Sequence, residues 1–325
     1  MSNYKSRSKD NYTRHDHYQE LTDRVVAALE AGTRPWQKPW NPDVAGGAAA
    51  PVNAATGHRY RGVNVLALGM SPLAFTSEDP RWTTYKQASE RGWQVRRGER
   101  GTTVFFFKQL QVGDDRGSDE SDERGKRIPI MRSFTVFHAS QIEGIPPFTP
   151  PRAAQPISER IESVETIIRN SKAVIRIGGD RAFYSPSTDH VQVPSDAAFH
   201  TPHDRAATCL HECGHWSGAR HRLNRDLSGR FRSDLYAKEE LRAELSSYLV
   251  GNILGIPTDI PNHASYLASW IKILKNEKRE LFRAAADAQK IADYLLAFHP
   301  DYADSTETTN PRDTDSSDET LAEAA

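Results

Sequence analysis

The stretch Leu210–Arg222, LHECGHWSGARHR, holds three histidines, one carboxylate and one cysteine within thirteen residues. His211, Glu212 and His215 form the pattern His-Glu-x-x-His. Positions i and i+4 of a helix share one face, so both imidazoles can reach a single metal ion. A glutamate beside the first histidine can take a proton from a water that zinc has activated for attack on a carbonyl. The stretch therefore predicts a helix that carries a zinc-dependent peptidase site.

The residues around the motif support a half-buried helix. Ala206, Cys209, Leu210 and Cys213 are apolar and form the backing face, which places the motif near the middle of the helix. Cys213 then faces away from the metal, and we expect both cysteines to pack as small buried residues. They are poorly placed for a disulfide on one helix, which favours a reducing, cytoplasmic compartment. We interpret His221 as a surface histidine.

A second amphipathic helix, predicted over Tyr236–Leu254, carries the acid that the motif lacks. Glu240 and Glu244 are four residues apart, so one could bind the metal while the other orients a ligand histidine through its free ring nitrogen. By analogy with zincin metallopeptidases we prefer Glu240 as ligand, and Glu244 remains the alternative ligand. A simpler alternative treats these acids, with Glu239, as solvated charges paired with bases of the same helix.

The predicted ligand set also indicates the kind of metal site. Two histidines and one carboxylate leave a fourth coordination position open, which favours a catalytic over a structural zinc. Further polar residues of the C-terminal half are candidates for stabilising an oxyanion, namely Tyr236, His263 and Tyr266.

The periodicity of apolar residues predicts an α+β fold. The expected helices cover residues 18–31, 60–70, 83–92, 157–170, 204–222, 236–254, 263–275 and 278–298. The expected strands are a pair at 102–112 and 127–139 and a short meander at 172–179, 181–185 and 190–194.

The length of 325 residues suggests two domains with polar tails. We expect a disordered N-terminus (1–16), an N-terminal domain (17–145), a proline-rich linker (146–156), a C-terminal domain (157–299) and a disordered acidic tail (300–325). The charged stretch 113–126 cannot bury a core and is interpreted as a mobile insertion.

The bulk composition excludes a membrane-spanning protein and hides a local excess of bases. No run approaches the roughly 20 apolar residues of a membrane span, and the N-terminus lacks an apolar signal core. The formal net charge is only -1, with 42 bases against 43 acids. The segment 81–108, however, contains seven bases against two acids.

Aromatic residues are interleaved with these bases, a pattern that single-stranded nucleic acid requires. Cations follow the phosphates, and flat rings stack on unpaired bases. The candidate DNA-binding residues are Trp36, Trp40, Tyr60, Arg61, Trp82, Tyr85, Lys86, Trp93, Arg96, Arg97 and Arg100. In the alternative interpretation the aromatic residues form the core of a small α+β domain, and the arginines form its solvated face.

From about Tyr18 to Phe298 the sequence resembles the ArdC-type antirestriction proteins of conjugative plasmids and related mobile elements. The N-terminal motifs that carry the resemblance are PWQKPW, TGHRYRGVN, WTTYKQASERGWQVRRGERGTTV and FTVFHASQIEG. The C-terminal motifs are LHECGHWSGARHRLNRDL, YAKEELRAELSSYL and ASYLASWIKILK. The insertion at 113–126 and the acidic tail depart from the family pattern without touching a motif.

This resemblance implies a single-stranded-DNA-binding domain followed by a zincin-like metallopeptidase domain. It implies Zn²⁺ at His211, His215 and either Glu240 or Glu244, with Glu212 as the catalytic base. The expected partners are single-stranded DNA and a protein substrate of unknown identity, and the expected role is to help incoming DNA evade host restriction. Two alternatives stay open: an intracellular zinc peptidase whose basic half binds a protein, and a non-catalytic DNA-coating protein with a structural zinc.

Overall fold

The computed structural model describes residues 16–36, 50–75, 79–112, 126–149, 156–231, 233–258 and 266–303, with the backbone alone at 108–112 and 126–129. Trp40, His263, the residues 113–125 and most of both predicted tails lie outside the described residues. The fold is α+β, as predicted. No helix in the described ranges is long and apolar enough to cross a membrane.

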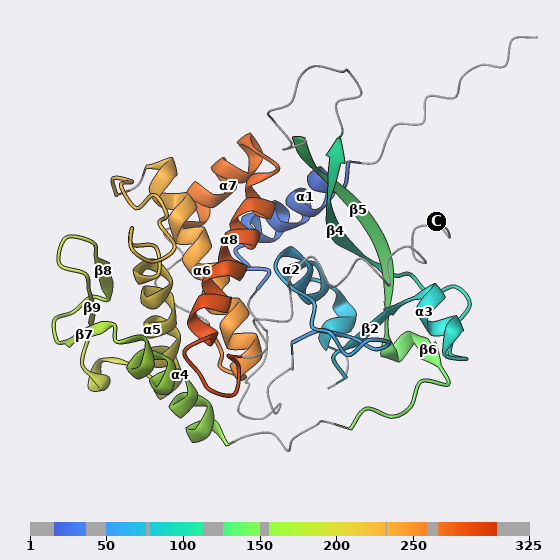
Figure 1. The fold of residues 1–325 in the computed structure, drawn as a ribbon, viewed down its shortest axis with the longest axis horizontal. Helices are drawn as coiled ribbons and strands as arrows, with labels where there is room; N and C mark the ends of the chain where they lie inside the picture. The colour runs from blue at the N-terminus through green and yellow to red at the C-terminus, as the bar shows by residue number, and fades with distance from the viewer. Residues whose placement is uncertain are drawn as a thin grey trace, which may run out of the picture.

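The described residues 16–149, called here the N-terminal half, contain short helices and a twisted sheet (Figure 1). The helices are α1 (His17–Glu30), α2 (Val63–Gly69) and α3 (Tyr85–Glu90). The strands are β1 (Val52–Asn53), β2 (Arg81–Thr84), β3 (Gln94–Val95), β4 (Thr102–Val112), β5 (Lys126–His138) and β6 (Ile142–Glu143). The main sheet has the order β1-β2-β5-β4, and β3 pairs with β6. The long antiparallel ribbon of β4 and β5 confirms the predicted strand pair.

The described residues 156–303, called here the C-terminal half, are mainly helical. The helices are α4 (Ile157–Ser171), α5 (Pro202–Trp216), α6 (Asp234–Leu254), α7 (Leu267–Asn276) and α8 (Glu280–Leu296). The short strands β7 (Val174–Ile177), β8 (Phe183–Ser185) and β9 (His190–Val193) form a sheet of order β7-β9-β8 beside α5 (Figure 1).

Helix α5 begins at a capping box and ends earlier than predicted. Thr201 and Asp204 form a capping box, and Pro202 occupies the first turn. The helix was predicted to continue to Arg222 but ends at Trp216. The chain then folds back, because the backbone N–H of Arg225 donates to Gly218 O and the guanidinium of Arg225 donates to the carbonyl of Gly214.

Helices α2 and α3 begin later than predicted. Thr83 and Thr84 pair with β5 as part of β2, and the Thr84 side chain then caps α3 through a capping box with Gln87. Helix α2 begins at Val63 because Gly62, with φ of 53°, adopts a left-handed conformation that cannot continue a helix.

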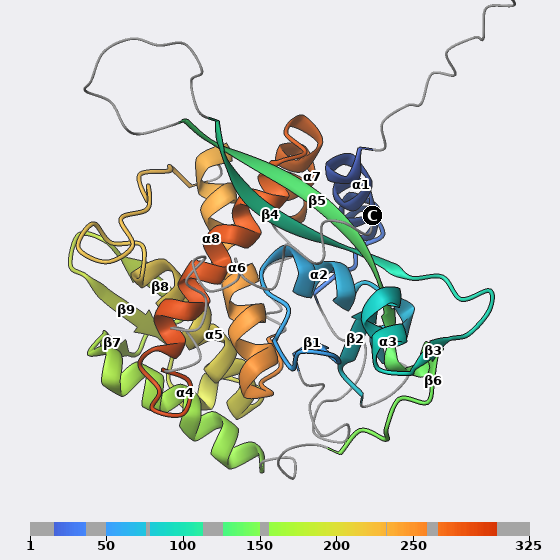
Figure 2. The same ribbon diagram turned by 45° about the vertical axis from the view of Figure 1, so that its right-hand side comes forward.

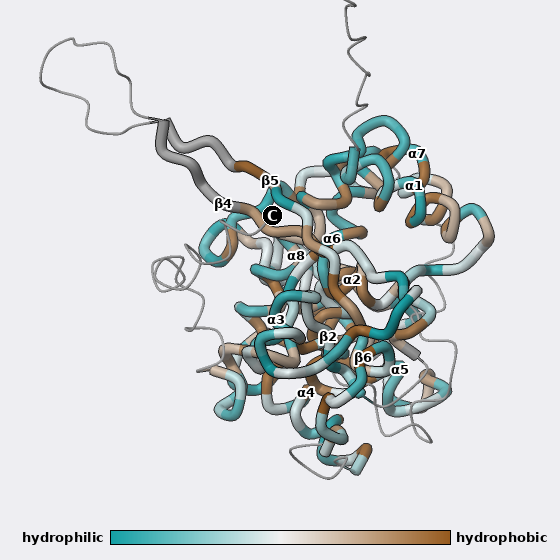
Figure 3. Tube along the Cα trace, turned by 90° about the vertical axis from the view of Figure 1, so that its right-hand side faces the viewer, coloured by the Kyte–Doolittle hydropathy of each residue, from teal (hydrophilic) through white to brown (hydrophobic). Residues whose placement is uncertain are grey.

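One hydrophobic core joins the N-terminal and C-terminal halves. Leu21 and Val25 on α1 belong to the same buried cluster as Ile273 on α7 and Leu281 on α8. Figure 2 shows α1 and α7 side by side, and Figure 3 shows the alternation of hydrophilic and hydrophobic residues along both helices. The rings of Phe105 and Phe282 connect β4 to α8 with centroids 5.1 Å apart. The division of the chain into two domains stays a prediction, but the halves are not separately packed bodies.

Candidate functional site

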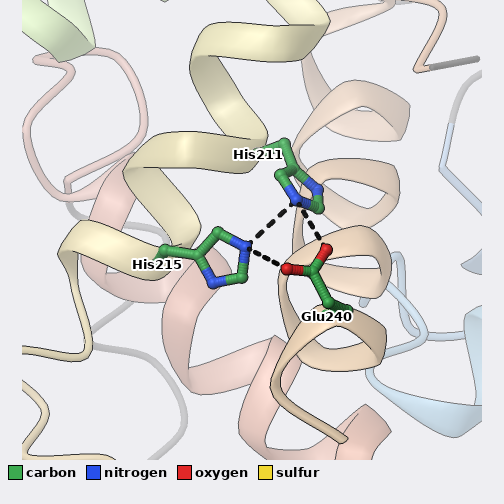
Figure 4. A group of neighbouring side chains, drawn as sticks. All are labelled: His211, His215 and Glu240. Atoms are coloured by element: carbon green, nitrogen blue, oxygen red, sulfur yellow. Dashed lines mark hydrogen bonds and ion pairs between the residues drawn. The ribbon is translucent and has the colours of Figure 1, made fainter. Parts of the chain in front are cut away.

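Helix α5 presents His211 and His215 on one face, one turn apart. Their Nε2 atoms lie 3.1 Å from each other (Figure 4). Gly214, within the same motif, allows α5 to approach α6 closely. A Cβ at this position would lie 2.9 Å from Ser246 Oγ and 3.4 Å from the Cα of Ala243. A residue with no side chain is therefore required where the two helices cross.

This close approach brings Glu240 of α6 to the two histidines (Figure 4). One carboxylate oxygen lies 3.5 Å from His211 Nε2, and the other lies 3.5 Å from His215 Nε2. One ligand atom of each of the three residues falls within 4.8 Å of the others. Three donor atoms from two helices therefore converge on one point.

The three donor atoms fit a divalent cation. Metal–nitrogen and metal–oxygen bonds of roughly 2.0–2.2 Å in a tetrahedron place ligand atoms about 3.3–3.6 Å apart. The two Nε2 atoms are 3.1 Å apart, and each lies 3.5 Å from a different oxygen of Glu240, so all three distances lie close to that range. Two imidazole Nε2 atoms at 3.1 Å cannot both carry a proton toward each other, whereas both can donate lone pairs to a shared ion.

His215 is oriented from behind by Glu239 and Arg225. The Nδ1 of His215 lies 3.2 Å from Glu239 Oε1, and Arg225 donates to both oxygens of that carboxylate at 2.7 and 3.2 Å. Burial acts to raise the pKa of Glu239, but the hydrogen bonds from His215 and Arg225 outweigh it and lower the pKa. Glu239 therefore stays ionised and fixes the orientation of the imidazole.

His211 has its own carboxylate neighbour, Glu244. The Nδ1 of His211 lies 3.8 Å from Glu244 Oε2, on the opposite side of the ring from Glu240. The other oxygen of Glu244 accepts hydrogen bonds from Trp36 Nε1 at 3.0 Å and from Arg34 at 3.2 Å. Glu240 thus lies beside the two Nε2 atoms that face each other, whereas Glu244 lies on the Nδ1 side of His211.

The site is strongly polarised by its own charges. Burial acts to lower the pKa of His215, but the charge of Glu240 and the hydrogen bond to Glu239 outweigh it and raise the pKa to about 9. Burial acts to raise the pKa of Glu240, but the charge of His215 and the hydrogen bond from His211 lower it to about 2. The carboxylates of α6 therefore form an anionic environment that favours a cation.

Glu212 and two tyrosines line a cavity of about 620 Å³ together with the three converging residues. The Tyr236 hydroxyl lies 3.1 Å from the Tyr266 hydroxyl. Burial and the nearby charge of Glu240 raise the pKa of Tyr236, so its hydroxyl stays protonated and can donate a hydrogen bond. His263, the third candidate for oxyanion stabilisation, lies outside the described residues. Apolar side chains also line the cavity, among them Phe183, Phe199 and Leu235.

Cys209, Cys213 and His221, which lie in or next to the stretch Leu210–Arg222, do not line the cavity. Cys209 and Cys213 are buried between α5 and its neighbours, and burial raises the pKa of the Cys209 thiol to about 12. Both thiols therefore serve packing, as predicted. The side chain of His221 is 65% exposed and lies beside Asp189, outside the residues that line the cavity.

Sequence reasoning missed the residues that hold the two carboxylates behind the histidines. Arg225 follows the motif by only ten positions from His215, but its contact with Glu239 depends on the turn that ends α5. Arg34 and Trp36 are more than 200 positions from Glu244. Glu239 itself was predicted only as a solvated charge, and its one signal in the sequence is that it is adjacent to the predicted ligand Glu240.

Two of the predicted DNA-binding residues are buried, and for these the prediction is wrong. Trp36 is 3% exposed and packs against Trp270, with ring centroids 5.8 Å apart. Trp82 is 2% exposed and contacts the ring of His138 edge-on at 4.8 Å. A base cannot stack on a ring that other side chains already cover. For these two tryptophans the alternative interpretation, a core role, holds.

Three further candidates are partly buried against other parts of the chain. Arg61 forms an ion pair with Asp293 of α8. The hydroxyl of Tyr60 is buried, and burial raises its pKa. Trp93 lies under the guanidinium of Arg91, 5.7 Å from the ring centroid.

The remaining candidates in the described ranges gather around α3 and the turn before β4. Tyr85 is 54% exposed, and Arg97 and Arg100 are also exposed. Arg96 is held by Glu99 at 2.8 Å, and Lys86 lies 4.0 Å from Glu90. Phe106 also belongs to the aromatic residues of segment 81–108 that the alternative interpretation places in a core, but it is 42% exposed on the ribbon opposite Arg132.

Comparison with known proteins identifies both halves. Residues 15–137 match the family model of the N-terminal domain of anti-restriction factor ArdC, and residues 162–287 match that of a zincin-like metallopeptidase. An uncharacterized protein y4eC of Sinorhizobium fredii is 41% identical over 290 residues, which cover 88% of this chain and 93% of that protein. A DNA primase TraC of Escherichia coli is 45% identical over 294 residues, which cover 86% of this chain but only 27% of the primase.

Two crystal structures of the antirestriction protein ArdC from plasmid R388 share the fold. The metal-free form has a TM-score of 0.71 at 37% identity and matches 87% of this chain and 98% of that chain. The Mn(II)-bound form has a TM-score of 0.67 at 35% identity and matches 91% of this chain and 100% of that chain. With both halves matched in order and the whole relative covered, the chain belongs to the ArdC family of antirestriction proteins.

Proposed function

We propose that this chain is the antirestriction protein of a mobile element, which binds single-stranded DNA through its N-terminal half and hydrolyses peptide bonds at a zinc site in its C-terminal half. The observation that carries the peptidase is the convergence of His211, His215 and Glu240 beside Glu212 at the wall of a 620 Å³ cavity. The proposed place of action is the cytoplasm, where thiols such as Cys209 and Cys213 remain reduced.

The proposed metal ligands are His211, His215 and Glu240, with Glu239 and Glu244 orienting the two imidazoles. A bound divalent ion would act as a Lewis acid that polarises a peptide carbonyl. Zinc suits two imidazoles and one carboxylate with an open position. The crystal structure with Mn(II) concerns the R388 relative and supports a divalent ion in this family.

Glu212 carries the proton transfers in the proposed mechanism. Its carboxylate takes a proton from the attacking water and then delivers it to the amine that leaves. Tyr236 donates its hydroxyl proton in a hydrogen bond to the oxyanion that develops on the former carbonyl, and Tyr266 holds that hydroxyl at 3.1 Å.

The test is cleavage of a defined peptide library by the full chain loaded with zinc, with new N-termini identified by mass spectrometry. We expect Glu212→Gln to retain its zinc and to lose about 10²–10⁴-fold in cleavage rate, the usual contribution of a general base. Equal cleavage by wild type and Glu212→Gln, or no cleavage by either at full zinc occupancy, would refute the peptidase.

The DNA-binding half of the proposal rests on the exposed group around α3. Tyr85 offers an exposed ring for stacking, and Arg97 and Arg100 are exposed bases in the turn before β4. The family match of residues 15–137 to the ArdC N-terminal domain supports the same assignment. DNA binding would place the peptidase beside proteins that act on the entering strand.

A further inference from the structure

The segment that follows α1 reaches the region behind the metal-site residues. Trp36 Nε1 donates to Glu244 Oε1 at 3.0 Å, and Arg34 donates to the same oxygen at 3.2 Å. The side chains of Glu244 and Arg34 are 1% and 10% exposed. A carboxylate so deeply buried needs charge-assisted hydrogen bonds to stay ionised and in one orientation.

The position of the Trp36 indole is itself set by the C-terminal half. Its ring meets the ring of Trp270 at an angle of 62°. Trp270 in turn donates from Nε1 to the carbonyl of Ala237 on α6 at 3.1 Å. Ala237 and Glu244 belong to the same helix, so the indole of Trp36 is held between α7 and the helix whose carboxylate it contacts.

The two histidines of the site are therefore supported from different parts of the chain. His215 is oriented through Glu239 by Arg225, and all three belong to the C-terminal half. His211 faces Glu244 at 3.8 Å, and the hydrogen bonds from Trp36 and Arg34 to Glu244 cross from the N-terminal half.

We propose that Trp36 and Arg34 are positioning residues of the metal site, which act on His211 through Glu244. The N-terminal half thereby completes a site whose ligands all lie in the C-terminal half. The proposal rests on the proposed function only in requiring that His211, His215 and Glu240 bind a divalent ion, and it is independent of peptide hydrolysis.

The experiment measures the Zn²⁺ affinity of the full chain by competition with a chromophoric chelator. Trp36→Phe keeps a ring against Trp270 and removes only the indole N–H. Residues that orient a metal ligand typically change affinity 10–100-fold, and we expect about 10-fold weaker binding for a group one step further away. Trp82→Phe, the same change at a buried indole in a separate cluster, should leave the affinity at the wild-type value.

A double-mutant cycle with Glu244→Gln separates positioning from general damage to the fold. Glu244→Gln removes the charge through which Trp36 is proposed to act, so Trp36→Phe should add less than about 2-fold in that background. Arg34→Gln should show the same loss of affinity alone and the same lack of effect in the Glu244→Gln background. Thermal unfolding of the metal-free variants accounts for any change in stability.

Two outcomes would overturn the proposal. One is a Zn²⁺ affinity of Trp36→Phe equal to that of wild type and Trp82→Phe. The other is a loss that persists in full in the Glu244→Gln background, since the indole would then act on the fold and not through Glu244. Neither outcome bears on the proposed peptidase activity. Conversely, zinc binding that depends on Trp36, in a chain that cleaves no peptide, would refute the peptidase and support the positioning role of Trp36.

Discussion

The Nδ1 atom of His215 lies 3.2 Å from Glu239 Oε1, and this carboxylate is held in turn by the guanidinium of Arg225. An imidazole oriented in this way presents its Nε2 toward His211 and Glu240 without any rearrangement. Removing the charge of Glu239 should therefore weaken metal binding while leaving all three proposed ligands in place.

We expect Glu239→Gln to weaken Zn²⁺ binding by about 10–100-fold, the range found when a ligand-orienting carboxylate is lost. Equilibrium titration against a competing chelator measures the change. Glu162→Gln, on the exposed side of α4, provides the matched control and should bind zinc as the wild type does. Equal affinity in the two variants would show that Glu239 does not support His215.

Gly214→Ala should separate α5 from α6. The new Cβ would lie 2.9 Å from Ser246 Oγ, and overpacking of a well-packed interior costs about 1–3 kcal/mol. Urea unfolding of the metal-free chain measures this loss. Ser246→Ala removes the contacting oxygen, so the double variant should regain part of the stability. A double variant no more stable than Gly214→Ala would contradict the proposed steric cause.

Alkaline pH should destabilise the fold through Cys209. Burial raises the pKa of this thiol from an ordinary value of 9.0 to about 12 in the folded state. The unfolded chain therefore releases a proton above pH 9 that the folded chain keeps, and this contribution to stability is lost as the pH rises from 9 toward 12. The slope is about 1.4 kcal/mol per pH unit for one thiol. Urea unfolding at pH 8.5–10.5 should show a shallower decline for Cys209→Ala, and identical slopes would contradict the burial effect.

The exposed bases near α3 should determine the salt dependence of DNA binding. Each phosphate contact contributes about 0.7 to the slope of log affinity against log salt for a single strand, so Arg97→Ala with Arg100→Ala should lower the slope by about 1.4. Tyr85→Ala should cost about 1–3 kcal/mol of affinity through lost stacking. Fluorescence anisotropy with an oligothymidine measures both effects.

Arg169→Ala, an exposed base on α4 in the C-terminal half, controls for the overall charge. An equal loss of affinity in this variant would show that no specific DNA surface exists around α3. Single-strand binding should also survive Glu212→Gln, because Glu212 lies in the cavity of the C-terminal half.

The sequence predicted the local parts of this structure well. The 3.6-residue periodicity located α4 and α6 almost to the residue, and the spacing of His211 and His215 predicted their convergence. Its errors lie where distant contacts override local preference. Helix α5 stops at Trp216 because the segment that contains Arg225 folds back on it, and no local sequence pattern predicts this contact.

The role of Trp36 shows a second reason for such errors. An aromatic residue among bases has the same composition whether it stacks on a nucleotide or donates to a buried carboxylate. The two cases differ only in what covers the ring, and here the covering residue, Trp270, comes from the other end of the chain. Glu244 likewise acquires its partners from more than 200 positions away.

The core that α1 shares with α7 and α8 bears on how this region can be exchanged between genomes. A crossover that joined one half to an unrelated sequence would leave the apolar face of that half uncovered and would separate Glu244 from its two donors. Recombination should therefore transmit the region only as a whole. The long TraC primase matches 86% of this chain, from both halves, within a much larger polypeptide.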